Sequence, residues 1–151
     1  MNIKIKLSDP KCKPVYATDG SAGMDLKANI QVGFILADIG TVITVPTGVF
    51  MEIPQGYEGQ IRPRSGLFKQ GIFATGTIDS DYRGEIKVTL IVLSKTWVEI
   101  EPFERIAQLV ISPVAKAELE VVTELSETKR GSGGFGSTGR TDIQQGGHGG
   151  Y

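Results

Sequence analysis

The stretch TVITVPTGVFMEIP, residues 41–54, determines the kind of fold that this chain can form. It contains two runs rich in β-branched and aromatic residues, TVITVP and GVFMEIP, and each run ends at a proline. Because such residues favour strands and proline interrupts them, we expect two strands here. A third run of the same character, EIKVTLIVLS, covers residues 85–94. The three runs predict a fold built mainly from β-strands.

The segments around these runs have the pattern of further short strands joined by turns. Residues 4–7 alternate lysine with apolar side chains, as a half-buried strand does. Only SGLFKQG, residues 65–71, is typical of a short helical turn. Turn residues recur in TDGSAG, IPQGYEG, DYRGE and EPFE. Many short strands with regular turns, and no repeat, predict a sandwich, a barrel or a jelly roll.

The distribution of glycine divides the chain into a body and an arm. The 151 residues are enough for one domain with a sizeable core. Nine of the 20 glycines lie within residues 131–150, so glycine usage in the rest of the chain is close to average. We therefore expect a compact body over residues 1–129 and a flexible glycine-rich arm over residues 130–151.

The arm contains RGSGGFGSTGR, residues 130–140, which nearly fits two nucleotide-binding signatures. Its glycines match the G-x-G-x-x-G spacing, but no helical pattern follows them to receive a pyrophosphate. It also resembles the Walker loop, but Ser137 stands where the phosphate-binding lysine is required. The segment is therefore neither signature, although glycines and hydroxyls still suit phosphate.

The overall charge and the single cysteine restrict the partners and the compartment. The net charge is −1 and the isoelectric point about 5.9, which argues against a nucleic-acid polymer as partner. Cys12 is the only cysteine, so an internal disulfide is excluded and a reducing compartment is favoured. No signal-peptide pattern and no long apolar stretch is visible. We expect an intracellular, cytoplasmic protein without a membrane partner.

The inventory of reactive side chains leaves carboxylates as the candidate general bases. The only histidine, His148, lies between glycines near the end of the arm, where it would be hard to hold in place. Cys12, between two lysines, is either a thiol of lowered pKa or, as we favour, an unreactive surface or edge cysteine. Zinc sites built from several Cys and His side chains are excluded.

Arginines gather in the second part of the chain, beside two segments with possible functions. All six lie between positions 62 and 140, and arginine suits phosphate oxygens, although scattered surface ion pairs are the alternative. GTIDSDYRGE, residues 76–85, is either a β-turn or a carboxylate held on a rigid hairpin beside an aromatic ring. PRSGL, residues 63–67, is either a capped helix start or an anion site.

Five segments together resemble the five motifs of the trimeric dUTPases, in order and in spacing. They are AGMDLKA (22–28), PRSGL (63–67), GTIDSDYRGE (76–85), ERIAQLVI (104–111) and RGSGGFGSTG (130–139). With their spacers they cover nearly the whole chain. The resemblance implies a jelly-roll-like β-barrel that forms a homotrimer with active sites shared between subunits. It also implies the Mg²⁺-assisted hydrolysis of dUTP to dUMP and pyrophosphate, which keeps uracil out of DNA and supplies dUMP for dTTP synthesis.

The resemblance assigns roles in catalysis and in recognition of the nucleoside. Asp79 would be the general base that activates the water attacking the α-phosphorus. Tyr82 would pack against the deoxyribose and exclude a 2′-hydroxyl. Backbone groups of Gly76, Thr77 and Ile78 would pair with uracil, with a further main-chain contact near Lys87.

The resemblance also assigns the residues that would hold the phosphates and the metal. Mg²⁺ would be bound by the triphosphate and water, with Asp25 near the metal-bound water and no side chain binding the ion directly. Phe135 in the arm would lie over the uracil ring. The phosphates would be held by Arg64, Ser65, Gly66 and Gln108 from the body, and by Arg130, Gly136, Ser137 and Thr138 from the arm.

Two rival functions and three departures from the motifs accompany this interpretation. One rival is a dCTP deaminase, which shares the fold but differs around residues 76–85. The other is a non-catalytic sensor that binds dUTP and regulates a partner. Met24 stands where an aromatic residue is common, and Phe68 replaces a smaller residue; we expect both to alter packing. Residues 140–151 extend past the last motif without an assigned function.

Overall fold

The computed structural model describes residues 1–93 and 97–134, and these form strands with little helix. Residues Met1–Lys116 make one compact unit, and a second unit begins at Ala117. In chain order the elements are β1 (Lys4–Leu7), the 3₁₀ turn η1 (Pro10–Cys12), β2 (Val15–Tyr16), β3 (Met24–Lys27), β4 (Ile35–Ala37), β5 (Val42–Glu52), β6 (Tyr57–Arg62), α1 (Ser65–Lys69), β7 (Ile72–Ile78), β8 (Ile86–Val92), β9 (Val98–Ile100) and β10 (Arg105–Pro113). The expected all-β fold with one short helix is confirmed.

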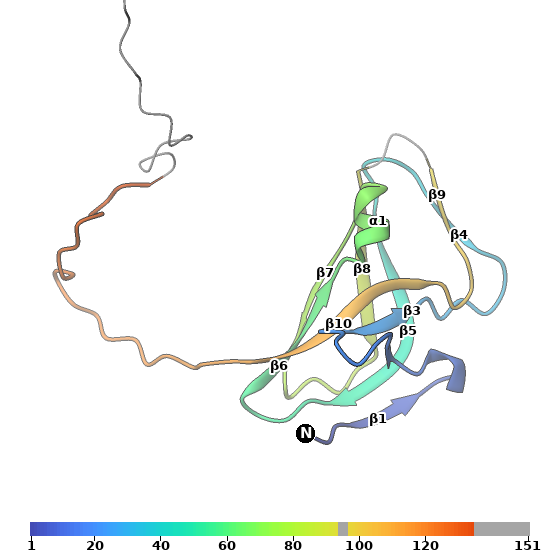
Figure 1. The fold of residues 1–151 in the computed structure, drawn as a ribbon, viewed down its shortest axis with the longest axis horizontal. Coiled ribbons are helices and arrows are strands. Elements are labelled where there is room, and N and C mark those ends of the chain that lie inside the picture. Colours follow the sequence, from blue (N-terminus) through green and yellow to red (C-terminus); the bar gives the residue numbers. More distant parts are fainter. Residues whose placement is uncertain (94–96, 135–151) are drawn as a thin grey trace, which may run out of the picture. The chain divides into compact units, whose positions relative to one another are not determined.

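Eight of the strands form one strongly curled sheet, in the order β1-β5-β8-β7-β6-β10-β3-β2, and β4 pairs separately with β9 (Figure 1). The sheet curls because β7 changes partner along its length. Residues 72–75 pair with β8, and residues 76–78 pair with β6. The two halves of the sheet thereby enclose one core. Its most deeply buried side chains include Leu26, Val45, Ile86, Leu90, Ile106 and Leu109.

Strand β5 corrects one expectation from the sequence. Pro46 does not end a strand, because β5 runs through it as a single element of 11 residues. The register with β8 shifts between Pro46 and Val49, so the two runs expected to form separate strands form one strand with a bulge. Gly48 lies in this bulge with φ of 69°. A bulge tolerates both the missing amide of a proline and the left-handed backbone of a glycine.

The bulge in β5 holds the start of β8. The buried hydroxyl of Thr47 donates to the carbonyl of Ile86 at 2.5 Å, and the amide of Gly48 donates to the carboxylate of Glu85 at 2.7 Å. Residues 85 and 86 join the loop after β7 to β8. The position of that loop is therefore set by hydrogen bonds to the interior of β5.

Cys12 lies against the same bulge and is fully buried. The expectation of a surface or edge cysteine is therefore wrong, and so is the alternative of a thiol of lowered pKa. Burial raises the pKa of the Cys12 thiol, and the neighbouring carboxylate of Asp9 adds to this. The thiol is protonated at neutral pH and packs as a small apolar side chain.

Replacing Gly48 with alanine should lower the free energy of unfolding by about 2–5 kcal/mol. The left-handed backbone disfavours a β-carbon by about 1–2 kcal/mol. The new atom would also lie 2.9 Å from both the Cys12 sulfur and the Asn29 side-chain nitrogen, and overpacking costs about 1–3 kcal/mol. Urea denaturation at a fixed protein concentration measures the loss.

Gly40→Ala is the matched control for this substitution. Gly40 has a similar φ of 78°, but nothing lies within 4 Å of the position its β-carbon would take. The Gly40→Ala variant should therefore lose only the roughly 1–2 kcal/mol that comes from the left-handed backbone. Equal losses in the two variants would show that packing against Cys12 and Asn29 contributes nothing.

The second unit, described from Ala117 to residue 134, contains neither helix nor strand in that range. Its last described part is a turn, in which the amide of Gly133 donates to the carbonyl of Arg130 at 3.0 Å. The expected division of roles between residues 1–129 and an arm at 130–151 stays a prediction. Within the described residues, no helix is long and apolar enough to cross a bilayer.

Candidate active site

The loop between β7 and β8 presents Asp79 and Tyr82 on a well-defined scaffold. The amide of Tyr82 donates to the carbonyl of Asp79 at 3.1 Å, and the Arg83 side chain donates to the carbonyl of Ser80 at 2.8 Å. The hydroxyl of Tyr82 donates to the carbonyl of Glu85 at 3.0 Å. The β-turn and the rigid hairpin are thus the same structure, and Asp79 is exposed on it.

The ring of Tyr82 lies over Gly84. A β-carbon at position 84 would lie 2.9 Å from a ring carbon of Tyr82, so only glycine leaves room for this orientation. The ring remains 43% exposed although its hydroxyl is hydrogen-bonded. Part of Tyr82 is therefore accessible in the loop that carries Asp79.

The strands that carry this loop separate before they reach it. The pairing of β7 with β8 ends at Thr75 and Thr89. Beyond that point residues 76–78 pair only with β6, while Lys87 and Ile86 pair with β5. Backbone groups of residues 76–78 and of the start of β8 thus face each other without a ladder between them. Paired donors and acceptors from a planar ligand suit such a gap.

Asp79 lines a cavity of about 400 Å³ between its loop and the start of β6. Ser80 and Asp81 from the same loop, Val114 and Lys116 from the end of the body, and residues 55–58 complete its lining. The cavity contains carboxylates and one lysine, so it combines a candidate base with room for a polar ligand.

A second group of predicted residues surrounds the start of α1. Arg64, Ser65, Gly66 and Gln108 line a cavity of about 510 Å³ together with Pro63 and Phe68. Arg64 occupies the N-cap position of α1, and its side chain makes no capping hydrogen bond. The alternative of a helix start capped by a side chain is therefore wrong for residues 63–67. Phe68 packs edge-on against Phe73 with ring centroids 4.6 Å apart, which agrees with a packing role.

The Arg64 side chain is held by a buried carboxylate. Asp25 on β3 is 1% exposed, and its two oxygens bind different arginines. The Arg64 Nε atom is 3.0 Å from Oδ1, and the Arg105 Nη1 atom is 3.3 Å from Oδ2. These contacts bring three of the five motif segments together.

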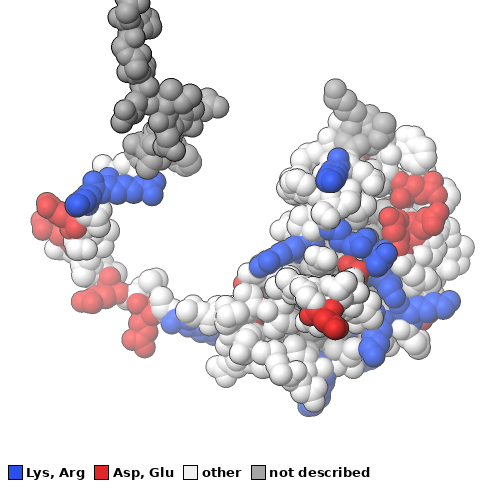
Figure 2. All heavy atoms as spheres, viewed as in Figure 1, with Lys and Arg blue, Asp and Glu red and all other residues white. Residues whose placement is uncertain are grey.

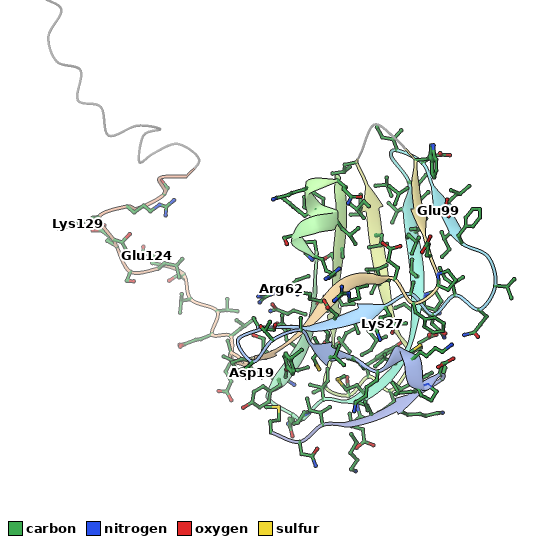
Figure 3. The ribbon with its side chains drawn as sticks, turned by 45° about the vertical axis from the view of Figure 1, so that its right-hand side comes forward. Asp19, Lys27, Arg62, Glu99, Glu124 and Lys129 are labelled. Atoms are coloured by element: carbon green, nitrogen blue, oxygen red, sulfur yellow. The ribbon has the colours of Figure 1, made fainter. Side chains whose placement is uncertain are left out.

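Cationic side chains gather over this part of the sheet. Figure 2 shows Lys and Arg side chains in a band over β10 and β3. The register places Gln108 of β10 between Asp25 of β3 and Arg62 of β6. Arg62 and Lys27, labelled in Figure 3, are the last residues of β6 and β3. The band suits a ligand with several negative charges.

The structure brings some of the predicted site residues together and leaves others apart. Arg64, Ser65, Gly66 and Gln108 share one cavity, whereas Asp79 lines another, and the two cavities have no lining residue in common. Arg130 belongs to the second unit. Phe135, Gly136, Ser137, Thr138 and His148 lie outside the described residues.

Arg105 is the residue near the site that sequence reasoning missed. It lies in the same segment as Gln108, but three positions away, and a regular strand would place the two on opposite faces. Ile106 and Ala107 are both buried, and the register shifts between Arg105 and Ala107. This bulge brings Arg105 to the face that carries Gln108. The sequence indicates this bulge by two consecutive apolar residues, Ile106 and Ala107, where a regular strand would alternate apolar and polar side chains.

Comparison with known proteins agrees with the fold and the motifs. Residues 9–139 match the dUTPase family model. The chain is 56% identical over 131 residues to the deoxyuridine 5′-triphosphate nucleotidohydrolase of Brucella melitensis, covering 83% of each chain. It is 53% identical to the protein of the same name from Rhizobium rhizogenes, covering 83% of this chain and 84% of that one.

A solved structure has a closely similar fold. It is a dUTPase of Staphylococcus bacteriophage 80alpha with dUpNHpp, and it aligns with a TM-score of 0.80 at 26% identity. The alignment covers 92% of this chain and 99% of that one. A dUTPase of phage phi11, at 21% identity and a TM-score of 0.73, is described with a structural Mg(II) ion.

A jelly-roll body with Arg64 lining one cavity and the carboxylate of Asp79 lining another agrees with a nucleotide hydrolase. The match over residues 9–139 and the identity to curated relatives specify which one. The chain belongs to the dUTPase family, and its activity is the hydrolysis of dUTP. A dCTP deaminase is not what these comparisons indicate.

Proposed function

We propose that the chain hydrolyses dUTP to dUMP and pyrophosphate, with Asp79 activating the water that attacks the α-phosphorus. The observation that carries this proposal is the position of Asp79, exposed on the hydrogen-bonded loop that closes the gap between β7 and β8. The carboxylate accepts a proton from water as the oxygen attacks phosphorus and the bond to the pyrophosphate leaving group breaks. The reaction would keep uracil out of DNA and supply dUMP for dTTP synthesis.

Recognition of the base rests on main-chain groups. Residues 76–78 and the part of β8 near Lys87 do not pair with each other. Their free amide and carbonyl groups support pairing with uracil. A fixed set of donors and acceptors would reject cytosine, whose pairing edge has the opposite pattern. The ring of Tyr82 would lie against the deoxyribose and leave no room for a 2′-hydroxyl.

Recognition of the phosphates rests on the cavity at α1. Arg64, with Ser65, Gly66 and Gln108, supplies charged and neutral donors that suit phosphate oxygens. From the arm, Arg130, Gly136, Ser137 and Thr138 would add contacts to the β- and γ-phosphates, and Phe135 would stack on uracil. Closure of the arm would exclude water other than the nucleophile.

Mg²⁺ would be held by the triphosphate and by water. Among the described residues, no group of three or more His, Cys, Asp or Glu side chains is arranged to hold a metal ion, and Asp25 already binds two arginines. This donor set fits an ion whose ligands come mainly from phosphate and water. When bound, the ion neutralises part of the phosphate charge. A contact of Asp25 with metal-bound water stays a prediction.

A homotrimer with shared sites would join the two groups of residues. Within one subunit Asp79 and Arg64 line different cavities, so a second subunit could bring a phosphate cavity to the base. The described part of the second unit also exposes apolar side chains, with Leu119 and Val121 each more than 90% exposed. Side chains of this kind support contacts with a neighbouring subunit.

An assay of pyrophosphate release from dUTP, dCTP, dTTP and UTP with Mg²⁺ tests the proposal. The wild-type protein should act on dUTP and discriminate against the other three. Tyr82→Ala should narrow the preference for dUTP over UTP, because space opens beside the sugar. Tyr82→Phe keeps the ring and loses only the hydrogen bond to the carbonyl of Glu85, so it should retain the preference.

Each other outcome of this assay identifies a different function. Ammonia release from dCTP would indicate a deaminase. Binding of dUTP without turnover would indicate the regulatory sensor. Unchanged discrimination against UTP in Tyr82→Ala would show that another group excludes the ribose.

A further inference from the structure

The carboxylate of Asp25 is shared by two arginines in different surroundings. Arg64 has a side-chain exposure of 29% and lines the cavity at α1, whereas Arg105 is 52% exposed and does not. Asp25 itself is almost completely buried between them. Such a buried carboxylate requires cationic or hydrogen-bonding partners. Asp25 therefore links a residue inside the cavity to one outside it.

The contacts fix the orientation of the Arg64 guanidinium. Its Nε–H donates to Asp25 at 3.0 Å, and its Nη1 donates to the carbonyl of Arg105 at 3.4 Å. A guanidinium has five N–H donors, so three remain for other acceptors. Because the group is planar and held at two of its nitrogens, the remaining donors point in fixed directions. Arg105 thus supports Arg64 in two ways. Its carbonyl accepts a hydrogen bond from Arg64, and its side chain binds Asp25, which in turn binds Arg64.

The charge balance of the cluster depends on the second arginine. One carboxylate between two guanidinium groups leaves a net charge of +1. Without the Arg105 side chain, Asp25 and Arg64 would form a neutral pair, and the carboxylate would compete with a phosphate for Arg64. When the Arg105 side chain is present, it balances part of the negative charge of Asp25 from outside the cavity. The positive charge of Arg64 is then available to an anion.

We propose that Arg105, acting through Asp25, is a positioning residue that holds Arg64 in the orientation that binds the substrate phosphates and leaves its positive charge available to them. The inference rests on the proposed role of Arg64. The bulge between Arg105 and Ala107 is what allows it, because it turns Arg105 to the face of β10 that carries Gln108. Arg105 itself makes no contact with the substrate.

Arg105→Gln tests the proposal, since the side chain is half exposed and its loss should leave the fold intact. The kcat/KM for dUTP should fall by about 10- to 100-fold, the range expected when a substrate-binding group is misplaced. Arg105→Lys, which retains the charge, should recover part of the loss. The inhibition constant of deoxyuridine, which has no phosphate, should not change. Lys6→Gln is the control for the loss of one surface charge, because Lys6 is exposed on β1 and lines neither the cavity at α1 nor the one that contains Asp79.

A double-mutant cycle shows whether Arg105 acts through Arg64. In an Arg64→Gln background, Arg105→Gln should cause little additional loss of kcat/KM. Equal losses with and without Arg64 would overturn the proposal, because Arg105 would then act on the substrate independently. An unchanged kcat/KM in Arg105→Gln, with a reduced value in Arg64→Gln, would overturn it while preserving the role of Arg64. An unchanged value in Arg64→Gln would remove the proposed function of Arg64 and the inference with it.

Discussion

Asp79→Asn should lower kcat for dUTP by about 10²–10⁴-fold, the usual contribution of general-base catalysis. The amide has nearly the same shape as the carboxylate but cannot accept a proton from the attacking water. Asp79 is exposed on its loop, so the substitution should not disturb the fold. Affinity for the substrate analogue dUpNHpp should therefore stay close to that of the wild-type protein. Single-turnover kinetics and equilibrium binding measure the two quantities separately.

The neighbouring carboxylate provides the control for this prediction. Asp81 is in the same loop, is also exposed and lines the same cavity as Asp79. If position decides which carboxylate is the base, Asp81→Asn should retain most of the turnover. Near-normal turnover in Asp79→Asn would remove Asp79 from the role. A larger loss in Asp81→Asn would transfer the role to that residue.

Deleting residues 130–151 should abolish most of the activity. Stacking of an aromatic side chain on a base contributes about 1–3 kcal/mol, and the deletion removes the proposed stacking of Phe135 together with the proposed phosphate contacts of Arg130, Ser137 and Thr138. The loss of kcat/KM should therefore exceed that of Phe135→Ala alone. Steady-state kinetics of the two variants makes the comparison.

Mixing two inactive variants tests whether sites are shared between subunits. The Asp79→Asn chain has an intact arm, and the arm-deleted chain has an intact Asp79. If the arm of one subunit closes over the Asp79 of another, unfolding and refolding the mixture should restore activity that neither variant shows alone. Each variant refolded by itself is the control. Mixed trimers that form and stay inactive would show that the arm serves Asp79 of its own subunit, or does not close the site.

The strands and the helix followed from local patterns, because alternation, β-branched runs and glycine turns act over a few residues. The short helix expected within residues 65–71 is α1, Ser65–Lys69. The bulge in β5 did not follow. Pro46 is normally a strand terminator, and only the pairing with Lys87 across the sheet shows that the strand continues. Pairing of this kind depends on residues about 40 positions away, which local patterns do not contain.

The candidate site shows the same division between local and long-range information. The motif segments supplied Asp79, Tyr82, Arg64 and Gln108 as candidates. The ion pairs of Asp25 join residues on three separate elements, and Arg105 reaches Asp25 only because β10 is bulged. Cys12 was misjudged for a related reason, since it belongs to the core and lies beside Gly48, which its lysine neighbours in the sequence do not reveal.

The gap between β7 and β8 has an evolutionary consequence. Point mutations exchange side chains and leave amide and carbonyl groups in place, so a base selected by the main chain of residues 76–78 is insulated from most of them. The side chain of Thr77 is exposed, so its replacement should leave this main chain in place. Gly76 is more constrained, because a β-carbon there would lie 3.0 Å from the terminal methyl group of Ile61, which would have to shift. On the proposed recognition of uracil by this main chain, base selectivity would depend on strand geometry more than on the side chains of residues 76–78.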